Sequence, residues 1–348
     1  MMRKISVGAF ALVILQIASC LNAQAQSGCV YWYQSLFYGY PAGWVPPLPA
    51  DSSQCSSVLT GAGYQVICWD VRSVCTPPPS YCPTCDKNQE AAGPPINLAN
   101  GNTYFVQSDV SIPGLGGGLA LQRTWNSMWP AYLGGPPIGL FGPNWRSTYE
   151  ETLSPGTGDA VNYMVYIRAN SSIWYFGPSN GSTSPLASPA NATATLTSGS
   201  SYWTITFQNG EQRRFDNVTG LLTTIIDRNG NTTSLTYDGA LRLTTVTDPV
   251  SRHLYFNYAN GSSRLVTGVT SDFSMSLSYA YDAQNRLSQV TKPDLSTINF
   301  TYNSQSLITS VTDSQGKVLE SHTYDGNGHG LTASQANGVN AVTITYPQ

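Results

Sequence analysis

The stretch YDGALRLTTVTDPVSRHLYFNY, residues 237–258, begins and ends on tyrosine, and the stretch that follows it also ends on tyrosine. Aromatic residues recur in this way through the last third of the chain: Phe215, Tyr237, Tyr258, Tyr281, Tyr302, Tyr324 and Tyr346. The steps between them are 22, 21, 23, 21, 22 and 22 residues. A constant period of this length is typical of repeat architectures. Residues 202–348 are therefore predicted to hold about six units of about 22 residues.

Each unit has the pattern of a β-hairpin, with an opening strand such as LTTVTD, a turn such as PVSR and a closing strand such as HLYFNY. In this closing strand Leu254, Phe256 and Tyr258 are two positions apart, so they share one face. A lone hairpin is marginal in water, so neighbouring hairpins are expected to pair into one continuous sheet with aligned apolar stripes. In the opening strand Leu243 and Val246 are three positions apart, and both can face inward only if the strand contains a bulge.

The composition supports an all-β protein. Charged residues make up 10% of the chain, against about 25% in an average globular protein. Tyr, Thr, Ser, Asn and Gly take their place, which favours strands and turns over amphipathic helices. The net charge is −3 and no cluster of Lys and Arg occurs. Nucleic acid and anionic membrane surfaces are therefore not expected as partners.

Residues 1–25 are predicted to be a signal peptide. Arg3 and Lys4 precede an apolar run that is short for a membrane span, and Ala23-Gln24-Ala25 is a cleavage signal. An uncleaved anchor is one alternative, and a loose lipobox that lipidates Cys20 is another. We expect an exported protein with no transmembrane segment after signal removal, either secreted or at the bacterial cell surface or periplasm.

Residues 26–93 are predicted to form a small disulfide-rich module that ends in a proline-rich linker. Six cysteines remain after the signal, an even number that suits an oxidising compartment: Cys29, Cys55, Cys68, Cys75, Cys82 and Cys85. The motif C-x-x-C at 82–85 is interpreted as structural. An aromatic cluster forms either the core of this module or a surface for a sugar or protein partner: Tyr31, Trp32, Tyr33, Phe37, Tyr38, Tyr40 and Trp44.

Residues 94–201 are predicted to form an antiparallel β domain that precedes the repeats and continues into the repeat array. TYFVQSDVSIP and LALQRTW alternate as strands, and the GLGGG between them indicates a turn because no helix follows it. NYMVYIRA and SSIWYFGP are predicted to pair as strands. The stretch STSPLASPANATATLTSGS is expected to be a loop.

No catalytic, metal-binding or cofactor-binding residue is predicted, so the chain is expected not to be an enzyme. Glu150 and Glu151 are adjacent on an expected strand and would point to opposite faces, which makes them a poor acid/base pair. The histidines are His253, His322 and His329, all within the repeats. His253 and His322 are interpreted as surface or sheet residues.

Residues 94–348 resemble the Rhs proteins, whose YD repeats have the form Y-D-x-x-G-R-L. The dipeptide occurs at Tyr237-Asp238, Tyr281-Asp282 and Tyr324-Asp325, and the Arg-Leu pair at Arg242-Leu243, Arg264-Leu265 and Arg286-Leu287. The preceding domain matches the Rhs phrases at Pro95, Asn97, Leu98, Gly101, Asn102, Asp109, Ile112, Pro113, Gly114, Arg123, Asn126, Ser127 and Trp145. Trp125 replaces the usual tyrosine.

The resemblance implies a β-shell that encloses a C-terminal toxin, or a surface role in adhesion or carbohydrate binding. About six units are few for a closed shell, and the D-P-x-G-type self-cleavage segment of the family is missing from this sequence. We therefore expect an open part of a shell. The first hypothesis is a non-enzymatic structural or cell-surface binding protein whose partner is a glycan or a protein. The second is the N-terminal part of an Rhs toxin-delivery shell, whose partner is the further YD repeats of a longer parent. The third is a secreted hydrolase.

Overall fold

A computed structural model describes residues 34–36, 55–60, 63–69, 91–92, 95–98, 100–129, 138–157, 160–177 and 182–346. The chain divides into two compact units, Met1–Pro78 and Pro79–Gln348. In the first unit, β1 (Gln34–Leu36), β2 (Cys55–Thr60) and β3 (Gly63–Trp69) form an antiparallel sheet in the order β1-β3-β2. Cys55 lies opposite Cys68 in the β2–β3 register.

The other predicted features of the N-terminal region lie outside the described residues. These are Cys20, Cys29, Cys75, Cys82 and Cys85, and the aromatic cluster from Tyr31 to Trp44. The disulfides, the lipidation and the aromatic surface therefore stay predictions.

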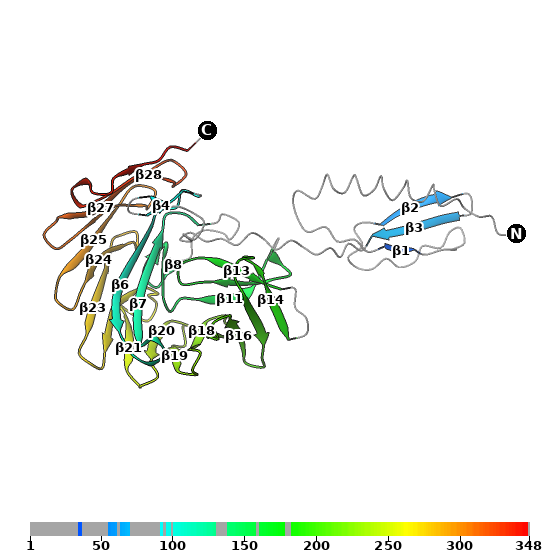
Figure 1. The fold of residues 1–348 in the computed structure, drawn as a ribbon, viewed down its shortest axis with the longest axis horizontal. Helices are drawn as coiled ribbons and strands as arrows, with labels where there is room; N and C mark the ends of the chain where they lie inside the picture. Colours follow the sequence, from blue (N-terminus) through cyan, green and yellow to red (C-terminus); the bar gives the residue numbers. More distant parts are fainter. Residues whose placement is uncertain are drawn as a thin grey trace. The chain divides into compact units, whose positions relative to one another are not determined.

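The second unit contains one antiparallel sheet of nineteen strands, here called the repeat sheet, in which each strand pairs with its neighbours in sequence (Figure 1). Its first half is β11 (Thr152–Pro155), β12 (Met164–Ile167), β13 (Ile173–Phe176), β14 (Thr183–Ser188), β15 (Ala194–Ser198), β16 (Tyr202–Phe207), β17 (Gln212–Asp216), β18 (Leu222–Ile226) and β19 (Thr232–Tyr237). Its second half is β20 (Leu243–Thr247), β21 (His253–Tyr258), β22 (Val266–Ser271), β23 (Ser276–Tyr281), β24 (Leu287–Thr291), β25 (Thr297–Tyr302), β26 (Ile308–Thr312), β27 (Val318–Tyr324), β28 (Gly330–Gln335) and β29 (Val342–Thr343). The predicted all-β fold and continuous sheet are confirmed.

A second, smaller sheet lies on the inner face of the repeat sheet. It consists of β10 (Trp145–Ser147), β7 (Leu119–Asn126) and β6 (Tyr104–Ile112) in that order, and it is here called the cover sheet. In Figure 1 the cyan strands β6 and β7 cross in front of the yellow repeat strands, and a single hydrophobic core joins the two sheets. The short pairs β4 (Ala91–Ala92) with β5 (Ile96–Asn97) and β8 (Ile138–Gly139) with β9 (Gly142–Pro143) lie beside them, with the 3-10 turns η1 (Leu115–Gly117) and η4 (Ala336–Gly338).

Most hairpin turns of the repeat sheet from β16 onward share one geometry. In the turn after β19, the Leu241 N–H donates to Asp238 O, the Asp238 N–H donates to Arg242 O, and Leu241 has φ 59°. This is a three-residue hairpin loop whose last residue is left-handed. The equivalent residue in the other regular turns also has positive φ, whether or not it is glycine: Gly230, Ser251, Ser274, Asn285, Leu295, Ser306, Gly316 and Gly328.

A β-bulge resolves the spacing of Leu243 and Val246, which are both buried. Thr236 pairs with Thr245 and Tyr237 pairs with Leu243, so Thr244 is an extra residue. The Thr244 hydroxyl donates to Thr236 O at 3.1 Å. The same register shift recurs in the later units, and there Thr267 and Thr309 make the equivalent hydrogen bond. The first residue of each opening strand and the fourth thus both face the core.

Three expectations were wrong in detail. Residues 183–188 and 194–198 are strands β14 and β15, not loop, because Ala194 and Leu196 alternate inward and threonine suits a pleated surface. Glu150 and Glu151 lie in the connection between β10 and β11, not on a strand. The pair Arg264-Leu265 is out of register, since Val266 takes the inward position and pairs with Tyr258.

Candidate functional site

The most specific construction in the described residues is the contact between the cover sheet and the repeat sheet. Each closing strand from β21 to β27 presents the residue two positions before its final tyrosine, and an aromatic ring of the cover sheet or of its flanks meets that residue. The pairs, with distances between ring centroids, are Tyr149–Phe256 (6.3 Å), Phe141–Tyr279 (4.8 Å), Trp145–Phe300 (5.4 Å) and Phe105–His322 (4.8 Å). The aromatic stripe predicted from the repeats therefore packs against the domain that precedes it.

Arg123 lies at the centre of this contact and is 1% exposed. Its Nη2 donates to Asp109 Oδ1 at 2.9 Å, and the Tyr279 hydroxyl donates to Asp109 Oδ2 at 2.8 Å. The guanidinium carbon lies 4.7 Å from the Trp145 ring centroid and 5.4 Å from that of Phe141. Burial by itself lowers the pKa of Arg123, but the adjacent Asp109 outweighs burial and the pKa is raised. Asp109 thus balances the charge of Arg123 where the two sheets meet, while Arg123 Nη1 has no hydrogen-bond partner in the described residues.

The Asp and Arg of the YD motif form a clamp between consecutive units. Arg242 Nε donates to Asp238 Oδ2 at 2.7 Å in its own turn, while its Nη1 donates to Asn260 O in the next turn at 2.8 Å. Its guanidinium also lies 4.6 Å from the Tyr258 ring centroid. The hydrogen bond from Arg242 holds the pKa of Asp238 below its ordinary value.

A second clamp repeats this arrangement one unit further along. Arg286 pairs with Asp282 in its own turn and lies 4.7 Å from the Tyr302 ring centroid of the next unit. Where Arg is replaced, His329 contacts Asp325 and the Tyr346 ring. Each unit is therefore bound to its successor by side chains as well as by the sheet.

The tyrosine hydroxyls make a second link, in the opposite direction. Each donates to a carbonyl oxygen at the start of the preceding opening strand: Tyr237 to Leu222, Tyr258 to Leu243, Tyr281 to Val266, Tyr302 to Leu287, Tyr324 to Ile308 and Tyr346 to Gly330. These distances are 2.6–2.8 Å. Burial raises the pKa of these hydroxyls above the ordinary value of 10. The tyrosines are thus structural rather than a free binding stripe.

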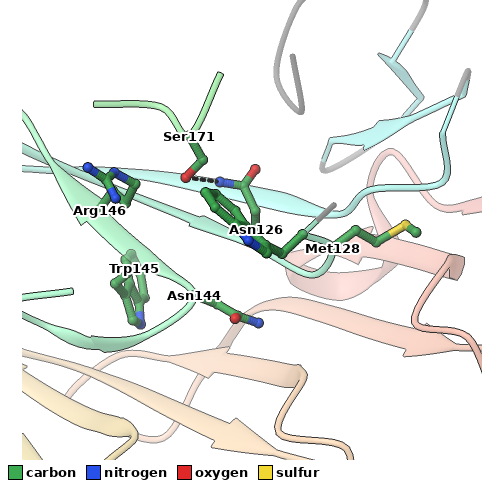
Figure 2. A pocket seen from close by; sticks show the side chains of 7 residues that line it. Asn126, Met128, Asn144, Trp145, Arg146 and Ser171 are labelled. Carbon is green, nitrogen blue, oxygen red and sulfur yellow. Dashed lines mark hydrogen bonds between the residues drawn. The ribbon is translucent and has the colours of Figure 1, made fainter. Parts of the chain in front are cut away.

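A small cavity of about 10 Å³ lies at the upper edge of the cover sheet and is lined by Asn126, Met128, Trp129, Asn144, Trp145, Arg146 and Ser171. Figure 2 shows Asn126 turned toward Ser171, to which its Nδ2 donates at 3.2 Å. Trp129 Nε1, Asn144 Oδ1 and Arg146 Nε are buried here without a hydrogen-bond partner. This volume suits one water molecule and no larger ligand.

The remaining candidate residues are not brought together. His253 Nδ1 lies 2.8 Å from Asp272 Oδ2 at the outer face, whereas His322 is buried beneath Phe105 and occupies the stripe position of its unit. Glu150 accepts from the Leu140 N–H, and Glu151 accepts from the Tyr166 hydroxyl at 2.6 Å. Among the residues that the structure describes, no group of three metal-ligating side chains occurs. No helix in the described part is long and apolar enough to cross a bilayer.

Two family models match the chain, one over the region of the cover sheet and one over part of the repeats. The domain of unknown function DUF6531 matches residues 93–176, which contain the cover sheet, and the RHS Repeat matches residues 217–253. Residues 217–253 are thus an RHS repeat of the YD type. Asp238 and Arg242 of the clamp thus belong to the YD motif of the matched repeat, and Tyr258 belongs to the unit that follows it.

Solved structures give more distant comparisons. TcdB2-TccC3 without its hypervariable C-terminal region is 11% identical, with a TM-score of 0.29, and the match covers 62% of this YD-repeat chain and 14% of that chain. TcdB2-TccC3-Cdc42 is 11% identical with a TM-score of 0.27, covering 71% and 15%. The Tc holotoxin pore of Photorhabdus luminescens is 11% identical with a TM-score of 0.23, covering 64% and 14%. The chain thus spans about a seventh of the length of these proteins. No curated protein matches it.

Proposed function

We propose that the chain is an exported, non-enzymatic YD-repeat scaffold that forms the sealed beginning of a β-shell wall. The observation that supports this is the filled inner face of the repeat sheet. Four aromatic pairs and the buried Arg123–Asp109 ion pair occupy the side on which an Rhs shell would hold its cargo. Because the cover sheet already fills the inner face of the repeat sheet, this part of the wall can continue into further units but leaves no space for cargo between the two sheets.

The partner we propose is a further set of YD hairpins from a longer parent. In the described part of the chain β29 pairs with β28 only, so one row of its backbone groups faces outward. Such an edge is a template for another strand. Tyr346 and His329 already form a clamp beside this edge.

Site-specific photo-crosslinking in cells that produce the protein tests this proposal. A photoreactive amino acid at Thr343, exposed on β29, is expected to crosslink to polypeptide of YD-repeat sequence. The same amino acid at Ala280, exposed on the interior strand β23, is the control and is expected to give no such product. Absence of a YD-repeat product at Thr343, or equal products at both positions, would overturn the scaffold proposal.

A glycan-binding or adhesive role stays the alternative. It depends on the aromatic cluster from Tyr31 to Trp44, which lies outside the described residues. The full secreted chain is expected to bind a polysaccharide panel only if this alternative holds. Substitution of Tyr31, Trp32 and Tyr33 by alanine would then abolish binding without changing the folded signal of the repeats.

We also propose that the chain has no enzymatic activity and that it is exported. A hydrolase would show turnover that disappears on substitution of a single acidic residue, whereas the scaffold is expected to show none. Export is tested by N-terminal sequencing of the protein recovered outside the cytoplasm. A mature N-terminus near Gln26 supports signal cleavage, and one at a lipidated Cys20 supports the lipoprotein alternative.

A further inference from the structure

A cavity of about 300 Å³ lies beside the least regular turn of the repeats. One wall comes from Ile138 and Leu140, which precede β10, and another from Leu241 and Leu243, at the turn between β19 and β20. A volume of this size is at the lower end of the range for small-molecule sites. Apolar side chains line most of the cavity, and five charged residues also line it: Arg146, Glu150, Glu151, Arg242 and Arg264.

Arg264 lines this cavity because the turn that carries it is longer than its neighbours. Tyr237 pairs with Leu243 and Tyr281 pairs with Leu287, but Tyr258 pairs with Val266, so the connection is two residues longer. Arg264 is thereby removed from the clamp position that Arg242 and Arg286 occupy. No described residue accepts a hydrogen bond from it or forms an ion pair with it, and it is exposed.

The other charged groups at the cavity are already engaged. Arg242 is held by Asp238 and by Asn260 O, and Arg146 donates to Glu150 O. Glu151 accepts from Tyr166. Glu150 accepts from the Leu140 N–H, and burial raises its pKa. Among the charged side chains of this cavity, Arg264 is therefore the exposed one that has no hydrogen-bond or ion-pair partner in the described residues.

The cavity wall also carries a strained residue. Leu241 has φ 59° at the turn position where the YD motif places glycine, and its side chain is 48% exposed. A left-handed conformation costs a leucine energy that glycine avoids. Other regular turns also carry a non-glycine residue at this position, so the conformation of Leu241 does not mark the site by itself; the relevant observation is that Leu241 and Arg264 line one cavity.

We propose that this cavity binds an organic anion with an apolar body, in which a carboxylate pairs with Arg264 and an alkyl group packs against Leu241, Leu243 and Ile138. An alkyl carboxylate of this kind occurs both in a fatty acid and at the C-terminus of a polypeptide. The site is independent of the scaffold function proposed above, since it uses neither the edge of β29 nor the cover contacts of Arg123.

Isothermal titration of the full chain with sodium octanoate and with N-acetylleucine tests the proposal. At least one of these anions is expected to bind, and the neutral N-acetylleucinamide is expected to bind about tenfold more weakly or not at all, since a charge-assisted hydrogen bond is lost. Stronger binding of octanoate would identify the fatty-acid source, and stronger binding of N-acetylleucine would identify a chain terminus.

Variants of single arginines test whether the anion binds at this cavity. Arg264→Gln is expected to weaken binding about tenfold, and Arg264→Lys is expected to retain part of it. Arg228→Gln, at an exposed arginine of a different turn, is the matched control and is expected to leave binding unchanged. Because Arg264 has no partner in the described residues, its variants should melt like the parent chain. Binding that is equal in Arg264→Gln, equal for acid and amide, or missing for both anions at millimolar concentration would overturn the proposal.

Discussion

Arg123 shows most clearly how one residue joins the two sheets of this protein. Its guanidinium is buried among aromatic rings, and its charge is balanced by Asp109, which the Tyr279 hydroxyl also contacts. A buried ion pair is a weak source of stability by itself, but removing one partner leaves an uncompensated charge in the core. The pair therefore specifies how the cover sheet sits on the repeat sheet.

Substitution of Asp109 or Arg123 alone should therefore lower the free energy of unfolding strongly. Asp109→Leu is expected to lower the free energy of unfolding by about 3–5 kcal/mol, because it leaves Arg123 charged and unpaired. The double variant Asp109→Leu with Arg123→Met should recover part of this loss. Urea unfolding of the full chain measures both, and Arg228→Met at an exposed turn is the control. A double variant no better than the single one would contradict this account of Arg123.

The left-handed turn residues define a matched pair of substitutions. Leu295 has φ 64° and is 81% exposed, so Leu295→Gly is expected to raise the free energy of unfolding by about 1 kcal/mol. Gly316 has φ 76° and a Cβ there would meet no atom within 4 Å, so Gly316→Ala is expected to cost about 1 kcal/mol through the backbone alone. Thermal or urea unfolding checks that the two substitutions change the free energy of unfolding in opposite directions. Equal signs would show that φ is not the deciding factor.

At the scale of the elements, the clamps make each hairpin dependent on the next. Arg286 pairs with Asp282 in its own turn and stacks on Tyr302 in the following unit. In a repeat array, such nearest-neighbour contacts set the cooperativity. The turn that carries Arg264 has no such clamp. At this place the Val266 N–H donates to Leu140 O, so the strands beside the cover sheet replace the missing contact.

This comparison predicts different effects for two arginines of the same motif. Arg286→Ala is expected to lower the free energy of unfolding by about 1 kcal/mol, because it removes a cation–π contact and a hydrogen-bonded pair. It should also speed hydrogen exchange in β23 to β26. Arg264→Ala is expected to change neither quantity. If both variants behave alike, the clamp does not couple the units.

At the scale of the whole molecule, the ladder of tyrosine hydroxyls runs through all the repeats. Burial raises the pKa of Tyr149 in the cover contact to about 12, and it raises the pKa of the ladder tyrosines as well. A group whose pKa is raised by folding binds its proton more tightly in the native state. Its contribution to stability is therefore complete below the unfolded value of about 10 and is lost as the pH rises above it.

The protein is thus expected to unfold cooperatively in alkali. Its free energy of unfolding should be level from neutral pH to about pH 10 and should then fall steeply, since unfolding releases the protons of many tyrosines together. Absorbance at the tyrosinate band and near-UV circular dichroism should change in one step. The urea-unfolded chain, titrating near pH 10, is the control. Ionisation of the buried tyrosines without loss of the circular dichroism signal would contradict this prediction.

The sequence by itself determined the repeat. Tyr237 and Tyr258 mark its period, alternation at Leu254 and Phe256 selects the inward face, and each turn lies where Asp and a residue such as Gly230 predict it. These features depend on neighbours within one unit, and local chemistry specifies them. The spacing of Leu243 and Val246 allowed a shared face only with a bulge, and the strand pairing shows that bulge.

Only the tertiary structure decided what covers the inward face. Nothing in the sequence near Arg123 indicates that it meets Tyr279, or that Phe105 meets His322, because those partners are more than a hundred residues away. Arg264 likewise lines a cavity because of the pairing between β21 and β22. A match of the sequence to the repeat motif does not show this pairing. Local periodicity can be read along one strand, whereas contacts between sheets depend on how distant strands are brought together.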